Sequence, residues 1–224
     1  MATAKTAGKL SRPPSFPPPL SDSTLALIEP QQRLAVIAED PVLEIHPDPV
    51  RVAAAFAHAN REHPLSSLTF EPVDGGGVLI LASDGARLLA LTVKDASATR
   101  RLVLPAATVQ NLLKAHKDSN YVAVVEHGPG EVTFQSYGHL CGMSAYAIVT
   151  TEGGEGIPGI PKMPTEIEDR PVKFQTDLLR LTLSALKDIQ YMHLSQLGNS
   201  GPLRIDFSAD QYNGQLWVCR CSGE

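Results

Sequence analysis

Two short apolar runs in the middle of the chain predict a β-hairpin. The runs Val78–Ala82 and Leu88–Val93 are rich in residues that favour strands. The five residues between them, Ser83 to Arg87, read Ser-Asp-Gly-Ala-Arg. An Asp-Gly pair between such runs is a strong hairpin signal, because the turn needs a positive φ that glycine adopts without strain. We therefore expect two antiparallel strands that turn at Gly85.

The same order of elements recurs three times along the chain. A short apolar strand leads into a helix with one apolar stripe, and strand-like runs separated by Gly or Asp turns follow. The three copies open at Leu43, Arg101 and Val172. The first two have the pattern β-α-β-β-β, and the third has the same pattern with one strand fewer. This repetition predicts an α+β fold in which helices lie on one face of antiparallel sheets.

Composition ahead of and between the copies predicts the domain organisation. Residues 1–20 are dominated by Pro, Ser and Lys and are expected to form a flexible tail. Residues 21–41 have the pattern of a helical N-terminal extension. We expect a domain of two units over residues 42–150, a Gly- and Pro-rich linker over residues 151–171, and part of a second domain over residues 172–224.

Basic residues cluster on the polar sides of the three predicted helices, although the net charge of the chain is −5. Cations spaced in this way suit a surface that follows a phosphate backbone without reading bases. Lys and Arg are also good helix formers on any exposed face, so a purely structural explanation stays open. The residues expected to face DNA are Arg51, His58, Arg61, Lys114, Lys117, Arg180 and Lys187.

Composition also narrows the class of protein. No apolar run is long enough to span a membrane, and the N-terminus lacks the apolar core of a signal peptide, so we expect a cytoplasmic protein. Three cysteines are too few for a disulfide framework, and the spacing of Cys and His predicts no metal site. Ser83 lacks the glycines of a nucleophile elbow. We therefore expect neither an enzyme nor a bound cofactor.

The hairpin and its flanking segments resemble the bacterial sliding clamp, the β subunit of DNA polymerase III. In that family a strand is followed by Ser or Thr, Asp, Gly, any residue, Arg and Leu, as in Ser83–Leu88. Four other segments resemble further parts of the family, namely Ala59–Glu71, Arg101–Lys114, Ile157–Pro164 and Val172–Lys187. The resemblance implies a DNA-clamp fold of repeated units with helices around a central hole. It also suggests a reduced or divergent member, encoded by a phage or mobile element.

Sliding clamps hold short linear motifs of polymerases and other replication proteins in a hydrophobic pocket. A turn that exposes apolar side chains would suit such an extended peptide with one or two anchors. Leu65 and Leu88 would equally suit an ordinary core. The positions that the resemblance assigns to the pocket are Leu65, Ser83, Gly85, Arg87, Leu88 and Pro164.

Two functions follow from this resemblance. The first is a processivity factor that, as a homo-oligomer, tethers replication proteins to double-stranded DNA without base specificity. The second is a clamp-fold interaction module that forms no ring and acts as a regulator or decoy by binding replication partners. Oligomerisation separates the two, because a closed ring needs two complementary sheet edges.

Overall fold

The computed structural model describes residues 41–115, 119–128, 131–138, 142–150, 156–157, 159–160, 174–197 and 201–219. The predicted tail, the predicted helical extension and most of the predicted linker lie outside these residues. The described residues all belong to one compact unit of the chain, Ile37–Glu224. Within this described part, no helix is long and apolar enough to cross a membrane.

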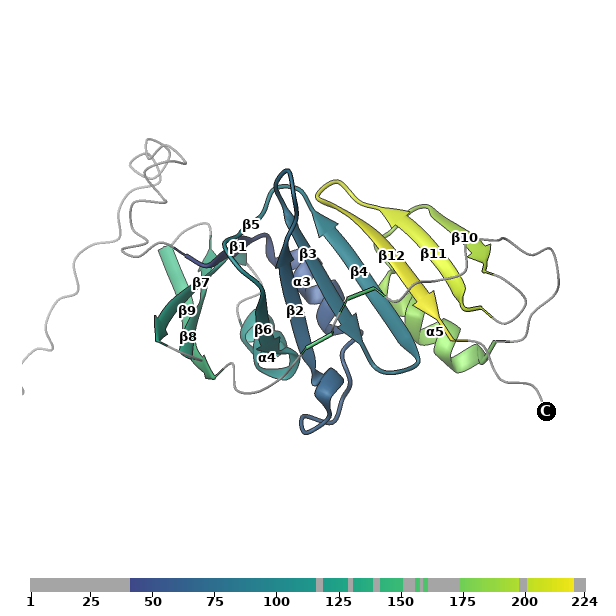
Figure 1. Ribbon diagram of the computed structural model, residues 1–224, viewed down its shortest axis with the longest axis horizontal. Coiled ribbons are helices and arrows are strands. Elements are labelled where there is room, and N and C mark those ends of the chain that lie inside the picture. Colours follow the sequence, from purple (N-terminus) through teal and green to yellow (C-terminus); the bar gives the residue numbers. More distant parts are fainter. Residues whose placement is uncertain are drawn as a thin grey trace, which may run out of the picture. The chain divides into compact units, whose positions relative to one another are not determined.

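Two antiparallel sheets form the framework of the described part (Figure 1). The five-stranded sheet contains, in spatial order, β5 (Ser97–Ala98), β1 (Leu43–Ile45), β7 (Ser119–Gly128), β8 (Glu131–Gly138) and β9 (Gly142–Thr150). The seven-stranded sheet contains, in spatial order, β10 (Met192–Gln196), β11 (Leu203–Ser208), β12 (Tyr212–Val218), β4 (Arg87–Val93), β3 (Val78–Ser83), β2 (Ser67–Pro72) and β6 (Leu102–Pro105).

Three α-helices cover the inner faces of these sheets in the described part. They are α3 (Pro47–Ala54), α4 (Ala106–Ala115) and α5 (Thr176–Ala185), and a 3₁₀ turn, η1, spans Pro64–Ser66. Val50 of α3 and Val109 of α4 are fully buried in one continuous apolar core. Because alternate strand residues point to opposite faces, Leu89 and Leu91 of β4 reach the same core.

The predicted hairpin and the predicted α+β class are both confirmed. Strands β3 and β4 pair antiparallel with Ser83 opposite Leu88. Gly85 lies in the turn between them with φ +92°, a left-handed conformation that glycine adopts at low cost. The helices lie on one side of antiparallel sheets, as the repeat pattern predicts.

The first two repeats exchange their leading strands. Strand β1 leaves the first repeat and pairs with β7 of the second, with Leu43 opposite Val124. In return β6, which opens the second repeat, pairs with β2 of the first, with Leu104 opposite Leu68. The third repeat joins the same sheet at another place, where β12 pairs with β4.

Two details of the sequence prediction are wrong. The third repeat is not one strand short after its helix, because β10 precedes β11 and β12. Helix α3 ends at Ala54, so His58 and Arg61 lie beyond it and not on its outer side as predicted. The chain then runs through turns to η1.

Candidate functional site

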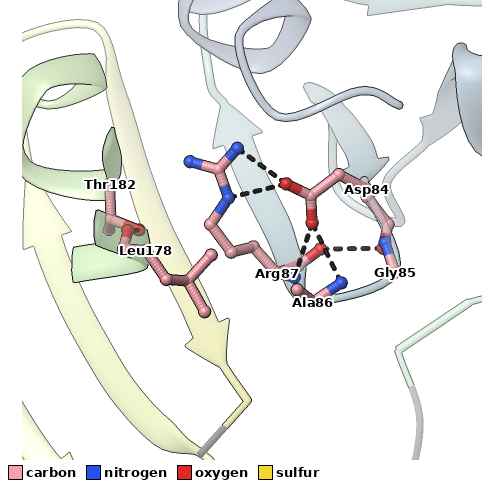
Figure 2. A network of polar contacts seen from close by, with 7 residues as sticks. Asp84, Gly85, Ala86, Arg87, Leu178 and Thr182 are labelled. Atoms are coloured by element: carbon pink, nitrogen blue, oxygen red, sulfur yellow. Dashed lines mark hydrogen bonds and ion pairs between the residues drawn. The ribbon is translucent and has the colours of Figure 1, made fainter. Parts of the chain in front are cut away.

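The turn between β3 and β4 is held by the carboxylate of Asp84 (Figure 2). Its Oδ1 accepts hydrogen bonds from the backbone N–H groups of Ala86, at 3.0 Å, and Arg87, at 2.7 Å. Its Oδ2 accepts a bond from Arg87 Nε at 2.8 Å and forms an ion pair with Nη2 at 2.7 Å. The Ser83 hydroxyl accepts from Gly85 N–H and donates to the Arg87 carbonyl. These hydrogen bonds form one connected network, and together they fix the shape of the turn.

Arg87 points toward the helices. Its side chain is 8% exposed, and its guanidinium carbon lies 4.8 Å from the centre of the buried Phe56 ring. Figure 2 shows the guanidinium on the side of the turn that faces Leu178 and Thr182 of α5. A cation over an aromatic face is attracted by the ring's quadrupole. Arg87 therefore anchors the turn from within, and its guanidinium lies on the opposite face of β4 from Leu88.

The outer face of the seven-stranded sheet carries a second, smaller apolar cluster. Leu65 and Leu88 pack at its margin and are only partly buried. A Cβ placed on Gly85 would lie 3.9 Å from Leu65 Cδ1, so Leu65 lies against the turn. The buried members of this outer cluster are Leu81, Ala90, Ile157, Leu197 and Trp217.

Trp217 connects this cluster to the third repeat. It lies in β12 opposite Leu88 of β4 and is 5% exposed. Its indole Nε1 is buried and has no hydrogen-bond partner among the described residues. A buried N–H without an acceptor is costly, so native proteins rarely leave one. Sequence reasoning missed this residue, although the chain has only one tryptophan.

The first described residues of the predicted linker cross the outer face. The Ile157 N–H donates to Thr69 Oγ1 at 2.9 Å, and Arg101 Nη2 donates to the Ile157 carbonyl at 2.7 Å. Ile160, three residues after Ile157 and 42% exposed, lines a hollow of about 420 Å³ with Leu79 and Ala90. Toward β11 and β12 the lining of the hollow becomes largely polar, with Asp206, Asn213 and Gln215.

Two histidines position Leu65. The Leu65 N–H donates to His63 Nδ1 at 3.1 Å, and the His58 N–H donates to the Leu65 carbonyl at 3.0 Å. The two imidazole rings stack with centroids 4.0 Å apart. His58, which the sequence assigned to a DNA-facing helix, thus supports the loop that presents Leu65.

The remaining predicted DNA-facing residues lie at or near the three helices. Arg51 forms an ion pair with Asp48 at 2.8 Å, and Arg180 forms one with Asp177 at 3.0 Å. Lys114 is exposed in the last turn of α4. Two further cations, Arg61 and Lys187, are exposed in the turns that follow α3 and α5, and Lys117 lies outside the described residues.

Of the six predicted pocket positions, four lie together. Leu65, Ser83, Gly85 and Leu88 surround the turn, and Arg87 supports it from the opposite face. Pro164 lies outside the described residues. Whether these residues bind a peptide stays a prediction.

The exchanged repeats, the antiparallel sheets and the helices on their inner faces define the sliding-clamp fold, and solved structures show the same fold. The chain is similar to the DNA polymerase III beta subunit of Thermotoga maritima with TM-score 0.58 and 12% identity, over 81% of this chain and 65% of that one. The beta chain of Streptococcus pneumoniae gives TM-score 0.60 and 11% identity over the same shares. Proliferating cellular nuclear antigen of Entamoeba histolytica gives TM-score 0.54 and 10% identity, over 81% of this chain and 99% of that one.

Identities this low show a shared fold and no more. The chain spans 65% of the length of these bacterial beta subunits. No protein-family model and no curated protein matches the sequence.

Proposed function

We propose that this protein is a clamp-like tether that binds double-stranded DNA without base specificity and holds replication proteins through their short linear motifs. One observation carries the proposal. The seven-stranded sheet separates an outer apolar cluster around Leu65 and Leu88 from an inner face covered by helices. Two surfaces on opposite sides of one sheet allow a peptide and DNA to bind at the same time.

The outer cluster has the properties of a peptide-binding pocket. Leu65 and Leu88 are partly exposed apolar anchors beside a rigid turn, and Trp217 of the third repeat is an aromatic residue opposite Leu88. Such anchors usually carry most of the energy of a small interface. Ser83, Gly85 and Arg87 would shape the turn, and Pro164 would extend the pocket.

The helix side has the properties expected of a loose interaction with phosphates. Lys114, Arg180 and Lys187 are exposed at or near helices α4 and α5. The ion pairs of Arg51 and Arg180 with neighbouring carboxylates lie at the surface, where such pairs are weak and exchange readily for other anions. Binding of this kind depends on the backbone charge of DNA and weakens as salt rises.

Reversal of the helix-side charges tests the DNA role. We expect a variant with Lys114→Glu, Lys117→Glu and Lys187→Glu to lose binding to a fluorescent random-sequence duplex, measured by anisotropy at low salt. The slope of log affinity against log salt concentration should become less negative by about 0.9 for each phosphate that the variant no longer neutralises. Lys94→Glu, an exposed charge just after β4, is the matched control and should bind as the unchanged protein does. Binding that persists in the triple variant would contradict the proposed DNA face.

A second function, an interaction module or decoy that binds replication partners without holding DNA, has one observation in its favour. Two of the proposed DNA-facing cations, Arg51 and Arg180, already pair with carboxylates on their own helices, which lowers the positive charge of that face. Capture of a replication polymerase by a protein that binds no DNA at any salt concentration would select this function.

A further inference from the structure

A cavity on the helix side of the seven-stranded sheet takes no part in the proposed function. It has a volume of about 310 Å³ and lies between α3, the end of α5 and the turn that joins β11 to β12. Its wall includes Tyr212, the first residue of β12 and a member of the main core. Ligand pockets start at about 300 Å³, so the cavity has room for a small molecule or for one side chain.

Carboxylates dominate the charged part of the wall. Asp48 comes from α3, Asp188 from the turn after α5, and Asp210 from the turn before β12. The one cation among the lining residues, Arg51, forms an ion pair with Asp48 at 2.8 Å. The wall therefore carries a net negative charge, which repels an anion and attracts a cation.

Two further polar groups of the wall lack partners of their own. Tyr212 is only 9% exposed, and its hydroxyl makes no hydrogen bond among the described residues. The side-chain oxygen of Gln211, next to it in the chain, is buried and likewise has no partner in that part of the chain. Native proteins rarely leave buried polar groups unpaired. A ligand with several N–H donors would satisfy both oxygens.

The electrostatic surroundings of Tyr212 have the same sign. Burial raises the pKa of the Tyr212 hydroxyl, and the carboxylates of Asp48 and Asp188 raise it further. Helix α5 also ends at this wall, with its C-cap Leu186, and the C-terminal end of a helix carries a partial negative charge. Lys187 follows but is not among the lining residues. The hydroxyl, the helix end and the carboxylates thus favour a positive ligand together.

The rest of the wall is apolar and points to the shape of that ligand. Val52, Leu186 and Ile189 line the cavity beside the acceptor groups. A hydrocarbon chain that ends in a cation buries its methylene groups on such a wall and keeps its charge among the acceptors. In the part of the chain that the structure describes, no three carboxylate, imidazole or thiol groups lie together so that they could hold a metal ion. An organic cation fits these separated acceptors better.

We infer that this cavity binds an alkylammonium group, the amine end of an aliphatic chain. An ammonium group has three N–H donors. They match the Gln211 oxygen, the Tyr212 hydroxyl oxygen and a carboxylate of Asp188 or Asp210. A free aliphatic diamine and the lysine side chain of another protein offer the same chemistry, and the experiment below separates these two sources.

Isothermal titration calorimetry of the full chain at low salt, without DNA, tests the inference independently of the proposed function. The probes are cadaverine, Nα-acetyl-lysine N-methylamide, and pentanediol as a neutral molecule of the same length as cadaverine. We expect saturable binding of an amine, weakened by added salt, and none of pentanediol. Tighter binding of cadaverine assigns the cavity to a free diamine, and tighter binding of the lysine derivative assigns it to a protein side chain.

Substitutions on the wall test the assigned contacts. We expect Tyr212→Phe, and separately Asp188→Asn with Asp210→Asn, to weaken amine binding about tenfold each, because each removes acceptors of a charged donor. Glu62→Gln is the matched control, since it removes an exposed carboxylate from the loop before η1 and should keep the affinity. Thermal melting checks that each variant folds.

Three results would overturn the inference. The first is the absence of saturable binding for both amines, and the second is equal binding of pentanediol. The third is a folded set of wall variants that bind the amine as tightly as Glu62→Gln does. None of these results depends on whether the protein binds DNA, so failure of the proposed function remains distinguishable from failure of this inference.

Discussion

At the level of single residues, Asp84 is the centre of the candidate site. Its carboxylate satisfies two backbone N–H groups of the turn and neutralises the buried guanidinium of Arg87. The shape of this turn determines where Leu65 and Leu88 lie on the outer face. One side chain thus links the main core to the surface proposed to bind peptides.

Removal of this carboxylate should destabilise the fold. We expect Asp84→Ala to lower the free energy of unfolding by about 3 kcal/mol, because it leaves the buried charge of Arg87 without its partner. Urea unfolding measures the change. Asp74→Ala, in an exposed turn ahead of β3, is the matched control and should stay within about 0.5 kcal/mol. Equal effects of the two substitutions would show that the Asp84 network does not stabilise the turn.

The sequence predicted the turn at residue level but not its partners. Asp-Gly between two apolar runs requires only local chemistry, so Gly85 and its positive φ could be foreseen. The place of Trp217 opposite Leu88 depends on the pairing of β12 with β4, residues far apart in the chain. No local pattern carries that information, and Trp217 was therefore missed.

At the level of elements, we expect the start of α3 to respond to pH through its N-cap residue, His46. His46 is the N-cap, and its Nδ1 accepts a hydrogen bond from the Asp48 N–H at 3.3 Å, which requires the neutral imidazole. Burial lowers the pKa of His46 below its usual value, an effect that the nearby Asp48 carboxylate opposes and Arg51 reinforces. The unfolded chain therefore takes up this proton at a higher pH than the folded protein does.

His46 should make the folded protein less stable at acidic pH. Because the folded pKa of His46 is lowered, stability is present above the unfolded value of about 6.5 and is lost as pH falls below it. His46→Asn keeps a good cap that does not titrate. We expect the stability of the unchanged protein, relative to this variant, to fall between about pH 7 and pH 5 in urea unfolding. A constant difference over that range would rule out the cap as a titrating element.

Elements with a strong periodic pattern of apolar residues could be predicted from the sequence, whereas elements with a weak pattern could not. Strands β3 and β4 follow their apolar runs closely. Strand β10, with the sequence Met-His-Leu-Ser-Gln, lacks a clear alternation because it is an exposed edge, and it was overlooked. The helical pattern after Leu43 continues beyond Ala54, where the chain in fact turns so that Leu65 can reach the hairpin. Tertiary packing overrode local preference at both places.

At the level of the whole molecule, the repeats were readable from the sequence but their exchange was not. A repeated order of strands and helices predicts units, whereas the pairing of β1 with β7 and of β6 with β2 arises only when two units fold together. The boundaries of the two predicted domains, residues 42–150 and 172–224, stay a prediction.

The proposed function requires that one molecule hold DNA on its helix side and a replication protein on its outer side. The decisive measurement is capture of the organism's replicative DNA polymerase on immobilised duplex DNA, at a salt concentration that washes off the polymerase alone. We expect retention only when this protein is present. Leu88→Ser should release the polymerase while the protein itself stays on the DNA, and the triple charge reversal should release both. Polymerase retention that is the same with and without this protein would contradict the proposed function.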